Sequence, residues 1–342
     1  MAVKTAATLA YLKNLPNLSS NKVLSGQWIG GLHYICGRNA TNVRGCEDDL
    51  IYQATGLYAA IIGVDYFPSY GGNGTDFTKL NAHLINHSNN GGLVAMYLNF
   101  PNPATGNFWA NGVPDSSPDL TSFTYTDLYS NLPNSINTAF KASLDQLALG
   151  LTDLQNHNVV VLFRIFHEMT WSGIGFWAQG TTTQFKQLWI YTYNYMKTTK
   201  GLQNLLFVYA PNCGWGDAYY PGDAYVDIVG CDAYGAADAS GAFGQYTNQQ
   251  AAYPTKPFML SEYGICGPSN TSNNPKDPGY CTPSDLRPLM TGIKNNMPNT
   301  AGWINFGWVW SMDYNLNAQQ LLQDPWTITR DEVSFSVAGG PE

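Results

Sequence analysis

The feature that most constrains the fold of this chain is a regular alternation of short apolar runs with segments of helical period. Eight runs are rich in aliphatic, β-branched and aromatic residues, and polar or glycine-containing turns bound them. They are residues 23–28, 58–66, 93–99, 159–168, 205–210, 227–234, 257–264 and 303–310. Runs this apolar predict strands buried on both faces, as in a parallel sheet covered by helices.

The segments between these runs carry apolar residues at three- and four-residue spacing, which indicates amphipathic helices. The clearest is 135–156, and the others are 5–15, 48–55, 77–89, 182–199, 244–253 and 286–296. Eight strands alternating with helices over 342 residues predict one (β/α)₈ barrel, the TIM-barrel form of the α/β class. No Pro/Gly/Ser-rich linker divides the chain. We therefore expect a single domain over 1–342, with 337–342 as a frayed tail.

The composition narrows the range of ligands. The net charge is −8 and only 12% of residues are charged, whereas the chain holds 22 Tyr, 10 Trp and 34 Gly. A chain without a basic patch is a poor partner for nucleic acid. No segment approaches the roughly 18 apolar residues that a membrane-spanning helix needs. An acidic surface rich in aromatic and amide groups suits neutral, hydroxyl-rich ligands better.

Cysteine usage points to an oxidising compartment. The six cysteines are Cys36, Cys46, Cys213, Cys231, Cys266 and Cys281. The first two and the last two each bracket a short polar loop and predict local disulfides, which leaves Cys213 and Cys231 as the third pair. The alternative is six free thiols in a cytosolic enzyme. No CxxC pair and no histidine at zinc-finger spacing is present, so we expect no metal site.

Other features also fit a secreted, extracellular protein. Five Asn-x-Ser/Thr sequons occur, although such sequons also arise by chance in a chain this rich in asparagine. They start at Asn17, Asn39, Asn73, Asn86 and Asn270. The N-terminus lacks a basic stretch followed by an apolar one. We therefore expect that a secreted form has already lost its signal peptide ahead of Met1.

Two of the apolar runs contain a glutamate close to their C-terminal end. Run 159–168 ends in His167-Glu168, and run 257–264 contains Glu262. Strict alternation would place Arg164, Phe166 and Glu168 on one side of the first strand, and Phe258, Leu260 and Glu262 on one side of the second. In a barrel of parallel strands, these tips face each other across the mouth, where the chemistry of such barrels takes place.

Paired carboxylates at a barrel mouth are the groups that glycoside hydrolysis requires. One acts as a nucleophile and the other donates and then accepts a proton, at a separation of about 5–5.5 Å in a retaining enzyme. The alternative is that each acid is structural and pairs with a buried arginine, for which Arg164 is available. The His-Glu pair is not part of an HExxH zinc motif, because position 171 is Trp.

Several segments resemble glycoside hydrolase family 26. Arg164-Ile165-Phe166-His167-Glu168-Met169, followed by Phe176-Trp177, is similar to the family's acid/base signature. Ser261-Glu262-Tyr263-Gly264 resembles its nucleophile segment, 226–234 its sixth strand, and the Trp308–Trp310 end its eighth strand. The likeness spans most of the predicted barrel. Members of the family are mostly endo-acting β-1,4-mannanases, with some β-1,3-xylanases and mixed-linkage glucanases.

The resemblance implies a role for several residues. Glu168 would be the acid/base and Glu262 the nucleophile. Tyr234 would donate a hydrogen bond to Glu262 and keep it ionised. His167 would orient the substrate or the acid/base, and Trp310 would form the platform under the sugar at the cleavage point, because aromatic faces stack on pyranose C–H surfaces.

The chain departs from the family pattern in two places. The loop after Met169 is longer than usual, so either Trp171 or Trp177 would supply the stacking surface that normally follows the acid/base. On the third strand Asn99 replaces the histidine that usually contacts the sugar. Trp109, in the long loop between 100 and 134, would stack on a distal sugar or anchor the loop.

Three further residues have two interpretations each. Trp308 would fill the barrel or join the sugar site, with filling preferred. Asp65 and Asp232 lie at strand tips, where a carboxylate could bind sugar hydroxyls or anchor a loop.

We therefore expect a secreted, monomeric, retaining endo-β-1,4-mannanase that acts on β-mannan and related oligosaccharides without a metal or cofactor. The alternatives are an endo-β-1,3-xylanase or mixed-linkage β-glucanase on the same scaffold, or a barrel that binds polysaccharide without cleaving it. Reducing-sugar release from the different glycans would separate these possibilities.

Overall fold

The computed structural model describes residues 1–20, 22–31, 47–66, 77–110, 113–123, 135–178, 180–214, 217–267 and 280–334. The side chains of Trp109, Ala110 and Val113 are outside this description. Cys36, Cys46 and the expected tail 337–342 also lie outside the described residues.

Eight parallel strands form a closed barrel, as predicted. In the order of their pairing they are β2 (Gly26–Gly31), β3 (Ile61–Asp65), β4 (Leu93–Tyr97), β7 (Val161–Arg164), β8 (Leu205–Tyr209), β9 (Ile228–Tyr234), β10 (Phe258–Gly264) and β11 (Thr300–Asn305). Pairing of β11 with both β10 and β2 closes the sheet. Two short strands, β1 (Val23–Leu24) and β12 (Thr327–Ile328), extend it beside β11.

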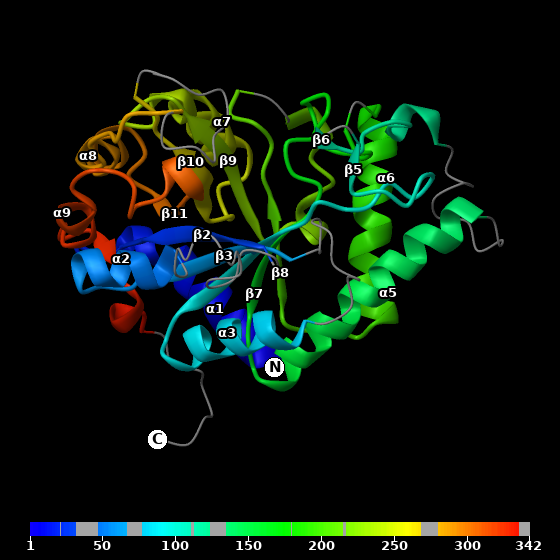
Figure 1. Cartoon of the computed structure of the whole chain (residues 1–342), viewed down its shortest axis with the longest axis horizontal. Coiled ribbons are helices and arrows are strands. Elements are labelled where there is room, and N and C mark those ends of the chain that lie inside the picture. Colours follow the sequence, from blue (N-terminus) through cyan, green and yellow to red (C-terminus); the bar gives the residue numbers. More distant parts are fainter. Residues whose placement is uncertain are drawn as a thin grey trace.

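Helices surround the strands, and all but the short last one, Ala318–Leu322, occupy segments that the apolar spacing predicts. They are α2 (Glu47–Thr55), α3 (Thr78–Asn89), α5 (Ser135–Asn156), α6 (Thr182–Asn194), α7 (Phe243–Ala252), α8 (Arg287–Asn296) and α9 (Ala318–Leu322). Figure 1 shows α5 and α6 on one side of the barrel and α2, α8 and α9 on the opposite side. Between β8 and β9 the described residues form only short turns, η4 (Asp217–Tyr219) and η5 (Asp223–Tyr225).

The apolar side chains form two layers, one inside the barrel and one between strands and helices. The inner layer includes Trp28, Ala95, Leu162, Val208 and Met259, and the outer layer is larger and takes the opposite faces of the same strands. Burial on both faces is the reason that the strand sequences are apolar throughout.

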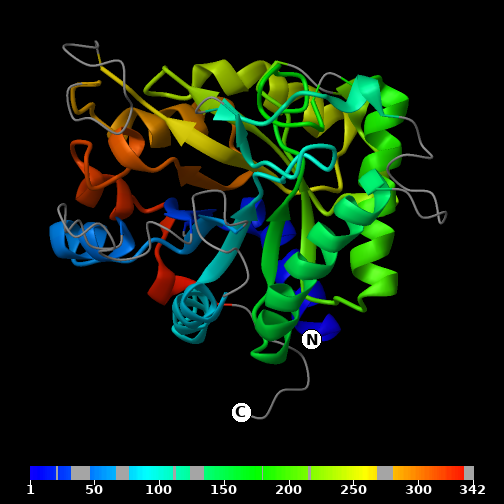
Figure 2. The same ribbon diagram turned by 45° about the vertical axis from the view of Figure 1, so that its right-hand side comes forward.

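The N-terminal helix α1 (Ala2–Asn14) covers the end of the barrel at which β7 and β8 begin. Lys4 Nζ donates to the Asn158 carbonyl at 2.7 Å, and Thr5 Oγ1 donates to the Gln203 carbonyl at 2.7 Å. Leu12 packs with the inner layer. The turned view in Figure 2 also places the N-terminus at this end. The carboxyl ends of the strands therefore form the end that is available to a ligand.

Two predicted strands differ most from their apolar runs. The run 303–310 contributes only its first residues to β11, and Trp308–Trp310 form a 3₁₀ turn, η7, so the strand interpretation of these tryptophans is wrong. The run 159–168 forms a strand only over Val161–Arg164. Both runs continue past the sheet into the barrel mouth.

Two predicted disulfides are confirmed, Cys213–Cys231 and Cys266–Cys281. Among the helices of the described ranges, none combines the length and the apolar character that crossing a membrane requires.

Candidate active site

Glu168 reaches the barrel mouth through an irregular backbone. Phe166 and Glu168 both have positive φ angles, 52° and 51°, in a region that residues other than glycine rarely adopt. Phe166 consequently packs in the outer layer, not beside Arg164, so strict alternation fails after Arg164. The Glu168 N–H donates to the Ala210 carbonyl at the end of β8, at 3.1 Å. The second positive φ brings the Glu168 side chain back to the mouth, where it is 4% exposed.

Glu262 faces the barrel interior because β10 contains a bulge. Phe258 and Leu260 lie in the outer layer, whereas Met259 lies in the inner one, so the prediction that they share a side with Glu262 is wrong. Leu260 pairs with Cys231 of β9, but Glu262 already pairs with Asp232. The extra residue reverses the alternation and turns the carboxylate inward.

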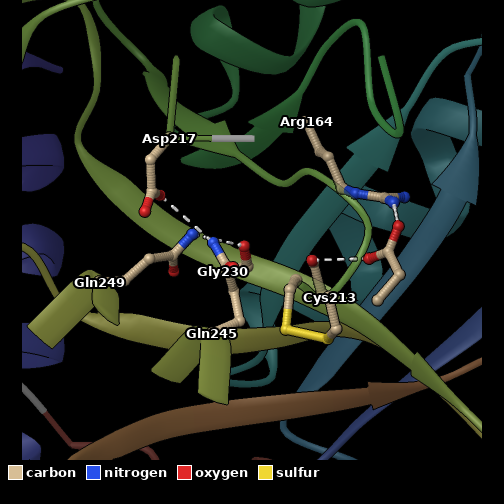
Figure 3. Close-up of a disulfide and its surroundings, with 9 residues drawn as sticks. Arg164, Cys213, Asp217, Gly230, Gln245 and Gln249 are labelled. Carbon is tan, nitrogen blue, oxygen red and sulfur yellow. Dashed lines mark hydrogen bonds and ion pairs between the residues drawn. A yellow bond between two sulfur atoms is a disulfide. The ribbon is translucent and has the colours of Figure 1, made fainter. Parts of the chain in front are cut away.

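Arg164, on β7, connects two carboxylates in the interior. Its Nη1 donates to Glu262 Oε1 at 2.6 Å, and its Nη2 forms a short hydrogen bond to Asp232 Oδ2. Ser261 Oγ donates to the other Asp232 oxygen at 2.8 Å. All of these side chains are buried. Figure 3 shows Arg164 extended toward its carboxylate partner near the disulfide of Cys213.

Glu168, Asp232 and Glu262 form one cluster, with an oxygen of each within 4.8 Å of the others. Within the described residues this is a group with the geometry to hold a cation, and the Arg164 guanidinium supplies a positive charge at the same place. Burial, followed by the charge of Glu262, raises the pKa of Glu168 to about 7. Asp232 has a carboxylate oxygen within 4.8 Å of Glu168, and burial raises the pKa of Asp232 well above the usual range. The pair thus retains a proton near neutral pH.

Tyr234 donates a short hydrogen bond from its hydroxyl to Glu262 Oε2. Burial of the hydroxyl, together with the charge of Glu262, raises the pKa of Tyr234 well above its usual range, so the group remains a donor. The ring itself is 41% exposed at the mouth. The two oxygens of Glu262 are therefore fixed from two directions, by Arg164 and by Tyr234.

Aromatic rings form a wall beside Glu262. The Tyr234 ring lies 5.7 Å from that of Trp310, and Tyr280 packs on Trp310 at 5.9 Å. Phe306 contacts Trp308 and Trp310, each at 5.9 Å. Trp308 is half-buried in this wall, so its preferred assignment as barrel filling is wrong, and Trp303 is the buried tryptophan of β11. Phe306 and Tyr280 were not predicted, because nothing local distinguishes them from core aromatic residues.

The turn that carries Trp310 is held by polar side chains that sequence reasoning also missed. Glu47 of α2 accepts the Trp308 N–H at 2.8 Å, and Trp308 has a positive φ of 61°. Asn305 Nδ2 donates to the Trp310 carbonyl at 3.1 Å, and Asn315 Nδ2 donates to the Val309 carbonyl at 3.0 Å. Glu47 lies 261 positions before Trp308 in the chain, and no sequence pattern links the two.

His167 and Trp177 pack together beneath the mouth. Trp177 is fully buried, and its Nε1 donates to the His167 carbonyl at 2.8 Å. Its ring has no open face for a sugar, so the assignment of Trp177 to substrate binding is wrong. His167 is also buried, and burial followed by the Arg164 charge lowers its pKa well below the usual range, which keeps the ring neutral. The Nδ1 of His167 has no hydrogen-bond partner among the described residues.

The remaining predicted site residues are Trp171, Asn99 and Trp109, and they lie in different environments. Trp171 is 59% exposed on the loop that follows Glu168. Asn99 is almost buried, and its Nδ2 donates to Asp65 Oδ2 at 2.7 Å. Asp65 therefore anchors the loop after β4 and sets the orientation of the Asn99 amide. The backbone of Trp109 forms the short strand β5 (Trp109–Ala110), which pairs with β6 (Val113–Pro114).

A barrel mouth with two inward carboxylates, one retaining a proton and one bound by Arg164 and Tyr234, defines a glycoside hydrolase. An aromatic wall at the same mouth suits a sugar chain. The sequence matches glycosyl hydrolase family 26 over residues 1–332, and the chain belongs to this family.

Characterised relatives agree with this assignment. A mannan endo-1,4-beta-mannosidase of Bacillus subtilis strain 168 is 32% identical, over 96% of this chain and 86% of the relative. A mannan endo-1,4-beta-mannosidase A and B of Caldalkalibacillus mannanilyticus is 30% identical, over 97% of this chain and 61% of the relative. The structure of Bacillus subtilis mannanase man26 superposes with a TM-score of 0.75 at 28% identity, over 96% and 92% of the two chains.

Proposed function

We propose that this glycoside hydrolase is a retaining endo-β-1,4-mannanase that cleaves internal bonds of mannan and glucomannan. The observation that carries the mechanism is the placement of Glu168 and Glu262, whose carboxylate oxygens approach within 4.8 Å. A separation this short leaves no room for a water molecule between the acids and the sugar, as an inverting enzyme would need. The names of the relatives support mannan as the substrate.

The first step is attack by Glu262 on the anomeric carbon. Arg164 and Tyr234 bind both carboxylate oxygens, so the attacking group is already oriented when the substrate arrives. Glu168, with its pKa raised to about 7, still carries its proton in about half of the molecules at pH 7, and it protonates the leaving glycosidic oxygen. The products of this step are a glycosyl ester of Glu262 and a free sugar chain.

The second step is hydrolysis of the ester. Glu168 is now ionised and removes a proton from a water molecule, which attacks the same anomeric carbon and releases Glu262. The pKa of Glu168 suits both roles, because a value of about 7 permits the group to donate and to accept near neutral pH.

We assign the substrate contacts as follows. Trp310 lies beside Tyr234 in the aromatic wall and is the platform for the sugar at the cleavage point. Trp171, exposed beyond Glu168, stacks on a sugar on the leaving-group side. Neutral His167 and the Asp65-bound Asn99 bind hydroxyl groups. Trp109 remains a prediction for a distal sugar.

The enzyme acts outside the cell in this proposal, as a monomer. The disulfides Cys213–Cys231 and Cys266–Cys281 support an oxidising compartment. An extracellular location also matches a polymeric substrate.

Replacement of Glu262 by Ala tests the assignment. We expect Glu262→Ala to lose mannan hydrolysis, and azide to restore cleavage only of glycosides with an activated leaving group, because azide can occupy the space of the missing carboxylate. Asp331→Ala removes an exposed acid, 77% accessible, and serves as the matched control that keeps activity. Hydrolysis of mannan by Glu262→Ala at the rate of the control would contradict the proposal.

Product analysis tests the substrate and the stereochemistry. Mannohexaose should yield internal cleavage products whose newly formed anomer is first β, as retention requires. Parallel assays on glucomannan, lichenan, laminarin and 1,3-xylan distinguish a mannanase from the glucanase and xylanase alternatives. Release of the α anomer first would rule out the double displacement, and binding without new reducing ends would indicate a non-catalytic barrel.

A further inference from the structure

The backbone of the acid/base residue is fixed to the end of β8. The Glu168 N–H donates to the Ala210 carbonyl at 3.1 Å, and the positive φ of Glu168 makes this an irregular and strained position. Any movement of Ala210 therefore changes the position of the Glu168 side chain relative to Glu262.

The segment after β8 has little backbone support of its own. The regular pairing of β8 with β9 consists of Val208 with Ile228 and Tyr209 with Val229. Pro211 follows Ala210 and has no N–H to donate, so the ladder cannot continue through it. The next backbone contact is an isolated parallel bridge between Asn212 and Asp232.

The Cys213–Cys231 disulfide closes this segment. It joins the residue after Asn212 to the residue before Asp232, with the two Cα atoms 5.0 Å apart. Cys231 is fully buried in the outer layer, whereas Ala210 belongs to the inner layer. The disulfide thus lies on the outer side of the strands, and Figure 3 shows it close to Gly230 of β9.

We propose that the Cys213–Cys231 disulfide is a positioning element, which holds Ala210 and Asp232 in register and thereby fixes Glu168 against Asp232 and Glu262. The inference rests on the proposed function, since it concerns the same acid/base. Both ends of the disulfide act on the cluster of carboxylates. One end acts through the Ala210 carbonyl on the Glu168 backbone, and the other through Asp232, whose carboxylate lies within 4.8 Å of that of Glu168.

The proposal predicts more than a loss of stability. The titratable and charged groups that face Glu168 come from three elements: Arg164 from β7, Asp232 and Tyr234 from β9, and Glu262 from β10. When the Cys213–Cys231 disulfide is removed, we expect water to enter between Glu168 and this cluster of groups. The desolvation that raises the Glu168 pKa is then weakened, and the pKa falls toward that of an ordinary glutamate.

The test compares two double variants that each remove one disulfide. Cys213→Ser/Cys231→Ala removes the Cys213–Cys231 disulfide, which has a sequence separation of 18. Cys266→Ser/Cys281→Ser removes the Cys266–Cys281 disulfide, which has a similar separation of 15. For the first variant we expect kcat on mannan to fall about tenfold with little change in KM, as for a modest displacement of a catalytic group. The basic limb of its kcat/KM profile should move to lower pH. The second variant should keep the wild-type basic limb.

A second measurement makes the result independent of turnover. The carboxyl carbon of Glu168 is titrated by ¹³C NMR in the wild type and in both variants, and we expect a lower pKa only in Cys213→Ser/Cys231→Ala. If that variant is folded and its titration and basic limb match those of the wild type, the proposal is overturned. The same downward shift in both variants would also overturn it. Failure of the wild type itself to cleave mannan would instead overturn the proposed function.

If the first variant cannot be purified, native enzyme is reduced with dithiothreitol. The dithiol is oxidised to its cyclic disulfide, and its two electrons and two protons convert the disulfide into two thiols. Peptide mapping identifies which pairs have opened. Loss of kcat and the shift of the basic limb should follow the opening of Cys213–Cys231, and opening without either change would contradict the proposal.

Discussion

Arg164 Nη1 lies 2.6 Å from Oε1 of Glu262, although 98 residues separate them in the sequence. Both side chains are buried, and the same guanidinium also pairs with Asp232. One arginine on β7 thus sets the position of two carboxylates on β9 and β10. The sequence presents Arg164 only as a charge in an apolar run, and the structure gives that charge two partners.

The first prediction concerns this buried ion-pair cluster. Arg164→Met should lower the free energy of unfolding by about 3–5 kcal/mol, because it leaves buried carboxylates without their cation. Arg287→Met removes an ion pair with Asp285 that is exposed to solvent, and should leave the free energy of unfolding close to the wild-type value. Urea unfolding at pH 7 measures the free energy of unfolding of both variants and of the wild type. Equal losses would show that Arg164 is no more important than a surface arginine.

The second prediction concerns stability as a function of pH. The folded-state pKa of Glu168 is raised from 4.5 to about 7, so the folded protein holds a proton that the unfolded chain releases. Stability from this group is therefore complete below about pH 4.5 and is lost as pH rises to about 7, by about 3 kcal/mol in total. Glu168→Gln cannot titrate and should show a flatter dependence.

The difference in stability between the wild type and Glu168→Gln isolates the contribution of Glu168. His83 pairs with Asp48, which helps to raise the His83 pKa, and so adds a loss of stability above pH 6.5 in both proteins. Denaturant unfolding at several pH values between 4 and 8 gives the comparison. Parallel stability curves for the wild type and Glu168→Gln would contradict the raised pKa.

The third prediction concerns the hydroxyl of Tyr234. Tyr234→Phe removes one of the two donors to Glu262, and a hydrogen bond to a charged group contributes about 1.5–3 kcal/mol. We expect kcat to fall roughly 10- to 100-fold. Tyr220→Phe removes a comparable hydrogen bond to Asp223, which is solvent-exposed, and should leave kcat unchanged. A Tyr234→Phe enzyme with the kcat of this control would show that the hydroxyl is dispensable.

The fourth prediction separates the two tryptophans that follow Glu168. Trp177→Ala should destabilise the protein by about 3–5 kcal/mol, because it empties a fully buried site. Trp171→Ala should change stability by no more than about 0.5 kcal/mol and raise KM for mannan roughly fivefold through the loss of one sugar contact. Thermal unfolding and initial rates on mannan test both. An unchanged KM in Trp171→Ala would remove Trp171 from the substrate site.

The apolar runs were sufficient to predict the barrel and the order of its elements. Each run contains residues of both layers, so the strands could be located from hydrophobicity alone. The two glutamates could also be found, since a carboxylate at the end of a strand buried on both faces is costly unless it has a use. The family resemblance rested on the same segments, and the match over residues 1–332 confirms it.

The orientation of Glu168 and Glu262 could not be predicted in the same way. Alternation assumes a regular strand, but Glu168 follows a backbone with two positive φ angles and Glu262 follows a bulge. Neither irregularity involves a glycine, which is the usual sign of such a conformation in sequence. The prediction that both acids face inward agreed with the structure, although the regular alternation assumed for each strand does not hold.

Contacts between residues that are far apart in the sequence could not be predicted either. Asp232 was noted as a residue at a strand tip, but its contacts with Arg164 and Ser261 depend on how three strands meet. Trp177 and Trp171 are separated by five residues and share a loop, yet one is fully buried and the other is 59% exposed. No local pattern distinguishes them.

The bulge in β10 has a consequence for anyone who would redesign this barrel. Deletion of the one extra residue near Ser261 would restore ideal pleating, and idealised strands are usually the easier ones to fold. In this strand the ideal pleat would send the Glu262 side chain into the helix layer and bring a neighbour into the mouth. A more regular protein would result, with the Glu262 carboxylate among the helices and not in the barrel mouth.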